Sequence, residues 1–152
     1  MLPTVVGTWE AFVPVVESYA EQWEAAGRDP ADRRIGCCSH FWVGSDGAAA
    51  RDRWRPRYLS YLEAVARWVD QSQRRAGRGG GSFGVGDFDT MLSTVAICGS
   101  VDEVVDRMAI AAQTLRLDTH LLMLDMGGVP DRELFDTVEF TGAEVIPRVA
   151  AL

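Results

Sequence analysis

Residues 35–43 read IGCCSHFWV and are followed at once by Gly44-Ser45-Asp46. β-branched and aromatic residues are frequent in this stretch, as is typical of a strand. Its alternate positions form two sets that are both largely apolar, which favours a strand buried on both faces. The Gly-Ser-Asp that follows is typical of a turn ending in a helix cap. The stretch therefore predicts a buried strand that leads directly into a helix.

Downstream of this strand, apolar residues recur at helical spacing from Trp54 to Val69 and predict that helix, kinked or split at Pro56. Residues 70–86 then change from Gln, Arg and Ser to Gly, and we expect them to form a flexible loop. Gly79 to Gly84 matches the G-x-G-x-x-G dinucleotide motif in form. A polar stretch precedes it where that motif requires a buried strand, so we interpret these residues as a solvated linker.

The second half of the chain repeats the alternation of strand and helix. Asp87 to Thr94 predicts a short helix, and Val95 to Cys98 predicts a brief strand. Ser100 and Glu103 match the S-x-x-E capping box, which predicts a helix running to about Leu115.

The apolar run at residues 121–124 predicts a second strand buried on both faces, between His120 and Asp125. Pro130 opens a last helix whose apolar stripe is Leu134, Val138, Val145 and Val149, and whose end is weakened by Gly142 and Pro147. A first helix from Thr8 to about Ala26 precedes all of these elements. Strands alternating with helices predict one α/β domain with a parallel sheet.

Composition excludes several classes of function. The 152 residues are 47% hydrophobic and carry a formal net charge of −7, which disfavours a nucleic-acid partner. Every one of the 15 basic residues is arginine, so Schiff-base and P-loop lysine chemistry are excluded. No apolar run is long enough to span a membrane and Met1-Leu2-Pro3 lacks the charged start of a signal peptide, so we expect a cytoplasmic protein without a membrane partner.

The 3 cysteines favour neither a disulfide framework nor a zinc site. Cys37 and Cys38 are adjacent, and no pair of Cys and His residues has the spacing of a zinc finger or a metalloprotease. We expect reduced thiols and no metal.

Six segments in order resemble the C-terminal part of the luciferase-like flavin-dependent monooxygenases. They are AEQWEAAGRDPAD, RIGCCSHFWVGSD, AAARDRWRPRYLSYLEA, AICGSVDEVVDRM, LRLDTHLLMLDMGGVPDREL and GAEVIPRV. The likeness covers the chain from about Trp9 to its end and rests on the order and spacing of the segments together.

The resemblance implies a partial (β/α)₈ TIM barrel, because a complete barrel of this type needs about 250 residues. It implies that residues 35–43 form the seventh strand and residues 120–126 the eighth, and that the parts which supply most contacts to the flavin phosphate are absent. It further implies an oxidoreductase that uses reduced flavin (FMN) and dioxygen to oxygenate a small organic substrate, with a flavin reductase as a possible partner. Deazaflavin, coenzyme F420, is the alternative cofactor.

Within that fold, the candidate cofactor-binding residues are His40, Trp42, Asp125, Gly127 and Gly128. His40 and Trp42 share the more polar face of their strand near its C-terminal end, where barrels bind ligands. The Asp125–Gly128 turn lies at the end of the last strand, where a backbone without side chains can approach a ring or a phosphate. The alternatives are that His40 and Trp42 are core residues and that Asp125 and the glycines only form a turn. The sequence identifies no catalytic residue.

A different class of function also fits the sequence. The chain would then be a non-catalytic, truncated module that associates with itself, as a homo-oligomer, or with a chain that supplies the rest of the barrel. A parallel sheet taken from a barrel has two open edges, and open edges favour association.

Overall fold

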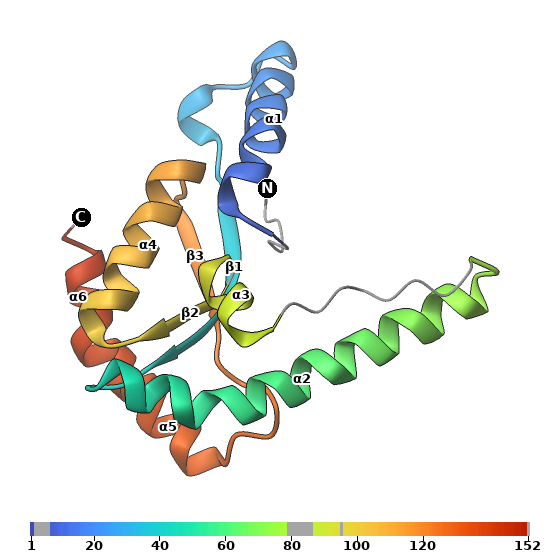
Figure 1. The fold of residues 1–152 in the computed structure, drawn as a ribbon. Coiled ribbons are helices and arrows are strands. Elements are labelled where there is room, and N and C mark those ends of the chain that lie inside the picture. The colour runs from blue at the N-terminus through green and yellow to red at the C-terminus, as the bar shows by residue number, and fades with distance from the viewer. Residues whose placement is uncertain (2–6, 79–86, 95, 152) are drawn as a thin grey trace.

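The computed structural model describes residues 1, 7–78, 87–94 and 96–151. Its centre is a 3-stranded parallel sheet with the strand order β2-β1-β3. The strands are β1 (Gly36–Val43), β2 (Ala96–Gly99) and β3 (Thr119–Met123). The α/β class and the parallel sheet predicted from the sequence are therefore confirmed, and Figure 1 shows helices on either side of the sheet.

Helices and short helical turns connect and follow the strands. They are a 3₁₀ turn at Trp9–Phe12, α1 (Val13–Ala25), a 3₁₀ turn at Pro30–Asp32, α2 (Gly47–Arg75), α3 (Phe88–Ser93), α4 (Val101–Leu115), α5 (Asp131–Phe140), a π-helical turn at Thr141–Val145 and α6 (Ile146–Val149). Among the described residues no helix is both long and apolar enough to cross a membrane.

The two faces of β1 belong to two separate apolar clusters, as the alternation in its sequence predicts. Cys37 and Phe41 pack with α4 in the first cluster, which also includes α1 and the N-terminal 3₁₀ turn. Trp42 packs with Trp54 and Tyr58 of α2 in the second. Helices cover both faces of the sheet: α4 covers the Phe41 face, and α2 covers the carboxyl half of the face with His40 and Trp42. Below, the Phe41 face is called the outward face, and the face with His40 and Trp42 is called the inward face.

Helix α2 differs from the helix that the sequence predicts in two ways. It is not split at Pro56, which lies within one continuous helix. Packing of Trp54, Tyr58 and Leu62 against the sheet compensates for the backbone hydrogen bond that a proline cannot donate. The helix also runs to Arg75, so residues 70–75 are helical and not part of a loop. Residues 79–86, with the G-x-G-x-x-G match, lie outside the described residues.

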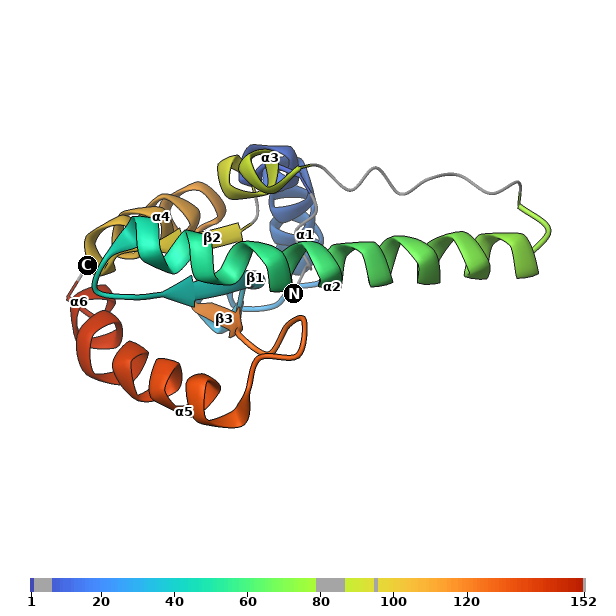
Figure 2. The ribbon, with the colours of Figure 1, turned by 60° about the horizontal axis from the view of Figure 1, so that its bottom comes forward.

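The C-terminal half of α2 projects beyond the rest of the described chain in both Figures 1 and 2. Trp68 on this half is 79% exposed. Packing alone therefore does not determine where this helix ends.

Strand β3 lies at an edge of the sheet, and the expectation that it is buried on both faces was wrong. It pairs with β1 from Gly36 to His40 and has no other strand beside it among the described residues. Leu121 is 43% exposed. An apolar run predicts a buried strand only where neighbouring strands and further layers cover it, and in the described part of the chain β3 has a neighbouring strand on one side alone.

The capping box predicted at the start of α4 is present in full, with hydrogen bonds from Glu103 N to Ser100 Oγ and from Ser100 N to Glu103 Oε2. The weak end predicted for the last helix is also confirmed, since α5 passes through a π-helical turn at Gly142 before α6. Its apolar stripe was misjudged. Val145 is buried, but Val138 is 50% exposed because Thr137 and Thr141 face the interior instead.

Candidate functional site

Parallel α/β sheets and barrels bind ligands at the carboxyl ends of their strands, so the candidate site is the end of the sheet near Val43 and Met123. His40 lies on the inward face of β1, in register with Met123 of β3. Its Nδ1 atom is 2.7 Å from the Tyr58 hydroxyl oxygen. The rings of Tyr58 and Tyr61 both meet the imidazole edge-on, with 5.4 Å between ring centroids. Burial lowers the pKa of His40 below its usual 6.5, so the imidazole is neutral at physiological pH.

Trp42 lies two residues further along the same face and is 3% exposed. It packs in the second apolar cluster and forms part of the wall of a cavity of about 370 Å³ at the carboxyl end of β1. The opposite wall comes from α5, with Glu133, Asp136 and Phe140. Most of the Trp42 side chain is therefore held by other residues of this chain, as the core interpretation of this residue expects.

The Asp125–Gly128 turn is explained by packing against α2. Gly127 has a φ of +68°, and a Cβ atom added there would fall on the carbonyl oxygen of Arg57. The backbone of the turn thus approaches a helix backbone. Met126 is 1% exposed and packs in the second cluster beside Tyr58. Asp125 is exposed, and nothing lies within 4 Å of the Cβ position of Gly128.

Arginines near the start of α2 tie this helix to its neighbours. Arg53 Nε and Arg57 Nη1 donate to the same oxygen of Glu133 on α5, at 2.6 and 2.7 Å. The hydrogen bond from Arg53, followed by that from Arg57, lowers the pKa of Glu133 to about 2. Arg55 reaches Asp89 of α3 at 3.3 Å.

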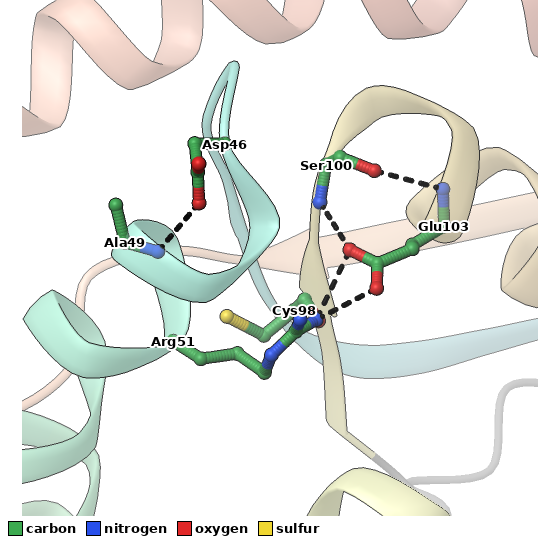
Figure 3. Close-up of polar contacts among 6 residues, drawn as sticks. All are labelled: Asp46, Ala49, Arg51, Cys98, Ser100 and Glu103. Atoms are coloured by element: carbon green, nitrogen blue, oxygen red, sulfur yellow. Dashed lines mark hydrogen bonds and ion pairs between the residues drawn. The ribbon is translucent and has the colours of Figure 1, made fainter.

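Arg51 connects the starts of α2 and α4, as Figure 3 shows. Its Nη1 atom lies 3.0 Å from the carboxylate of Glu103, the residue that closes the capping box of α4. Asp46 caps α2 by accepting a hydrogen bond from Ala49 N at 2.8 Å. Cys98 of β2 is beside this network, and burial raises the pKa of its thiol to about 12. The network fixes the first turns of α2 and α4. The Cys98 thiol beside it stays protonated and is therefore not a nucleophile at neutral pH.

A polar pair on the outward face of the sheet was not predicted. His120 Nε2 is 2.9 Å from Ser39 Oγ, and the two residues lie 81 positions apart in the chain. The His120 Nδ1 atom is buried without a partner among the described residues. Burial lowers the pKa of His120 to about 4. The hydroxyl–imidazole pair joins β1 to β3 inside the apolar layer.

The predicted site residues are thus on one side of the sheet, but they do not line one cavity. Tyr58 contacts both His40 and the cluster that contains Met126, so α2 lies between β1 and the turn. Trp42 is 3% exposed, so little of its ring can touch a ligand in the cavity that it lines, and the Arg57 backbone occupies the space beside Gly127. His40 fits a ligand contact, since it is partly exposed and its Nε2 atom has no hydrogen-bond partner among the described residues.

Known proteins resemble this chain in sequence and in structure. Residues 1–118 match the model of a family described as luciferase-like monooxygenases. A search of curated proteins finds no match.

Solved structures similar to this chain include a monooxygenase from Streptomyces bottropensis, with a TM-score of 0.66 and 20% identity over 97% of this chain and 40% of that one. The oxygenating constituent of 3,6-diketocamphane monooxygenase from Pseudomonas putida, solved in complex with FMN, is similar with a TM-score of 0.65 and 18% identity over 97% and 42% of the two chains. A coenzyme F420 dependent tetrahydromethanopterin reductase from Methanopyrus kandleri is similar with a TM-score of 0.62 and 21% identity, over 97% of this chain and 45% of that one.

These likenesses show the fold, which is part of a luciferase-like TIM barrel. This chain spans less than half the length of the three structures. In a barrel, strands that follow one another lie side by side. Here β1 pairs directly with β3, and β2, which comes between them in the chain, pairs with the other edge of β1, so the position of this short strand departs from the order of consecutive barrel strands.

Proposed function

Because this chain belongs to the luciferase-like monooxygenase family, we propose that it forms part of a flavin-dependent monooxygenase that oxygenates a small organic substrate with reduced FMN and dioxygen. The bound flavin supplies the activation of dioxygen. The residues of this chain orient the ligands and exclude water from one side of the site. A separate flavin reductase would provide the reduced flavin.

The free polar atom of His40 indicates where on the sheet a ligand would bind. His40 is the predicted residue that keeps a free polar atom on the inward face of the sheet, near the carboxyl end of β1. Leu121 of β3 leaves more of the same face exposed. We place the flavin or its substrate against this face. Residues outside this chain would supply the contacts to the flavin phosphate.

FMN is the cofactor we propose, and coenzyme F420 is the alternative. One of the similar structures is described as a complex with FMN, and another as a coenzyme F420 dependent enzyme. A direct comparison of the binding of FMN and of coenzyme F420 to this chain distinguishes the two possibilities.

The test is a titration of the chain with FMN and, separately, with coenzyme F420, followed by equilibrium dialysis. We expect His40→Ala to weaken flavin binding at least about tenfold while its melting temperature stays close to that of the unaltered chain. His120→Gln is the control, because His120 lies on the outward face and should leave binding unchanged. If His40→Ala weakens flavin binding and also lowers the melting temperature substantially, the result would instead support a core role for His40.

A second candidate function is that of a non-catalytic module that associates with itself or with a chain supplying the other strands. The observation that favours it is the open edge of β3, together with the short span of this chain relative to similar structures. If the chain binds neither cofactor but associates through this edge, the module is the better description.

A further inference from the structure

We propose that Tyr58 is a positioning residue that holds the His40 imidazole with its proton on Nε2, so that this face of the sheet offers an N–H donor to an acceptor oxygen of the ligand. The use of that donor rests on the proposed function. The position of the proton rests only on the contacts of this chain.

The burial of Tyr58 determines the direction of the hydrogen bond between Tyr58 and His40. Tyr58 is 0% exposed, and His40 Nδ1 at 2.7 Å is the hydrogen-bond partner of its hydroxyl among the described residues. If Nδ1 carried the proton, the hydroxyl would accept it and its own proton would have no acceptor in a buried place. A buried donor left unpaired is costly. The hydroxyl of Tyr58 therefore donates to Nδ1.

Packing holds the Tyr58 hydroxyl in this place. Its ring stacks on Trp54 with 4.2 Å between centroids, and it forms a T-shaped contact with Phe88 with 6.0 Å between centroids. All three side chains are buried in the second apolar cluster. Burial also raises the pKa of Tyr58 above its usual 10, so the hydroxyl keeps the proton that it donates.

The other ring nitrogen of His40, Nε2, is the one that carries the proton. With Nδ1 accepting, a neutral imidazole has its proton on Nε2. Nε2 has no partner in the described part of the chain, and it is not among the buried unpaired atoms. It is therefore open to a ligand on the inward face. The titratable groups that face this ring are Tyr58, Tyr61 and, on the same strand face, Cys38.

The N–H group at His40 Nε2 determines which chemical groups of a ligand can bind there. A neutral N–H donor recognises a carbonyl or another acceptor oxygen, and it gains nothing from a cation. Because the proton is on the exposed nitrogen, this histidine does not accept a proton there as a general base. The donor role and the base role require opposite states of Nε2.

The test is nitrogen NMR of the whole chain labelled at histidine. The sequence has 2 histidines, so His120→Gln assigns the remaining ring to His40. The couplings between the ring nitrogens and the carbon-bound protons identify the nitrogen that carries the proton. At pH 7.5 we expect the Nε2–H form of His40 to exceed the other by at least about tenfold.

Two variants separate a positioning role from a general structural one. Tyr58→Phe keeps the ring stack and removes the hydroxyl, and we expect the His40 ring to become a mixture of both protonated forms. Tyr61→Phe is the matched control, because that ring contacts the same imidazole and Tyr61 has no hydrogen bond to His40. It should leave the proton on Nε2. Near-ultraviolet circular dichroism shows whether each variant retains its packing.

A His40 ring that carries its proton on Nδ1 in the unaltered chain would overturn the proposal. So would a Tyr58→Phe variant that keeps its packing and an unchanged proton distribution. Neither result depends on flavin, so failure of FMN binding and failure of this inference are distinguishable.

Discussion

At Gly127 the turn after β3 touches the backbone of α2, and no side chain has room there. We expect Gly127→Ala to destabilise the fold by about 3 kcal/mol, because a methyl group would collide with the Arg57 carbonyl and strain the left-handed backbone. Gly128→Ala is the control. Its φ is also positive, at +71°, but the space around it is open, so we expect a loss of about 1 kcal/mol. Urea unfolding of both variants measures the difference, and equal losses would contradict the contact with α2.

His120 makes the stability of the sheet depend on pH. Its pKa is lowered by burial to about 4, so between pH 6.5 and 4 the unfolded chain binds a proton that the folded chain does not. Stability contributed by the neutral ring is complete above pH 6.5 and decreases as the pH falls through this window, by up to about 3 kcal/mol. His120→Gln should unfold with a shallower pH dependence from pH 7 to 4.5. A variant with the same pH dependence as the unaltered chain would contradict this account.

Sequence reasoning identified His40 as a candidate contact but missed Tyr58 and the Ser39–His120 pair. Local patterns place a residue on a strand face, but they do not show which residue far away in the chain meets it. Ser39 and His120 are 81 positions apart, and only the register of β1 with β3 brings them together. Gly127 was assigned to a ligand contact for the same reason, since its contact with α2 is not visible in the sequence.

Among the helices, α2 was predicted least well, since it is continuous through Pro56 and extends to Arg75. Its start follows from the turn at Gly44–Asp46, and the capping box of α4 was likewise predictable from local spacing. Its length was not predictable, because the polar residues 70–75 are helical without the apolar periodicity that indicates a helix in the sequence. The edge position of β3 was also hidden from the sequence, because an apolar run does not show how many strands lie beside it.

The attachment of α5 to α2 depends on Glu133, which accepts from two arginines of α2. We expect Glu133→Gln to lower the stability of the chain by roughly 1 kcal/mol, with a smaller effect in high salt. Glu139→Gln on the same helix is the control, because Glu139 is exposed and has no ion pair among the described residues. Thermal unfolding at low and high salt compares the two. An equal effect from both would show that the pairing with α2 contributes nothing.

The whole chain is an α/β unit with one covered and one partly open face. α4 and α1 cover the outward face, and α2 covers the carboxyl half of the inward face. Among the described residues no strand pairs with the outer edge of β3, and apolar residues such as Leu121 and Phe135 are exposed. Both features favour association. The proposed function requires further strands along this edge, and in a preparation of this chain alone we expect a second copy to supply them.

Light scattering coupled to size-exclusion chromatography tests this requirement most directly. The chain has a mass of 16.7 kDa, and we predict that the purified protein elutes as a dimer or a larger assembly and retains no flavin after desalting. A monodisperse 16.7 kDa species that stays yellow would contradict the claim that this chain is one part of a flavin-binding barrel.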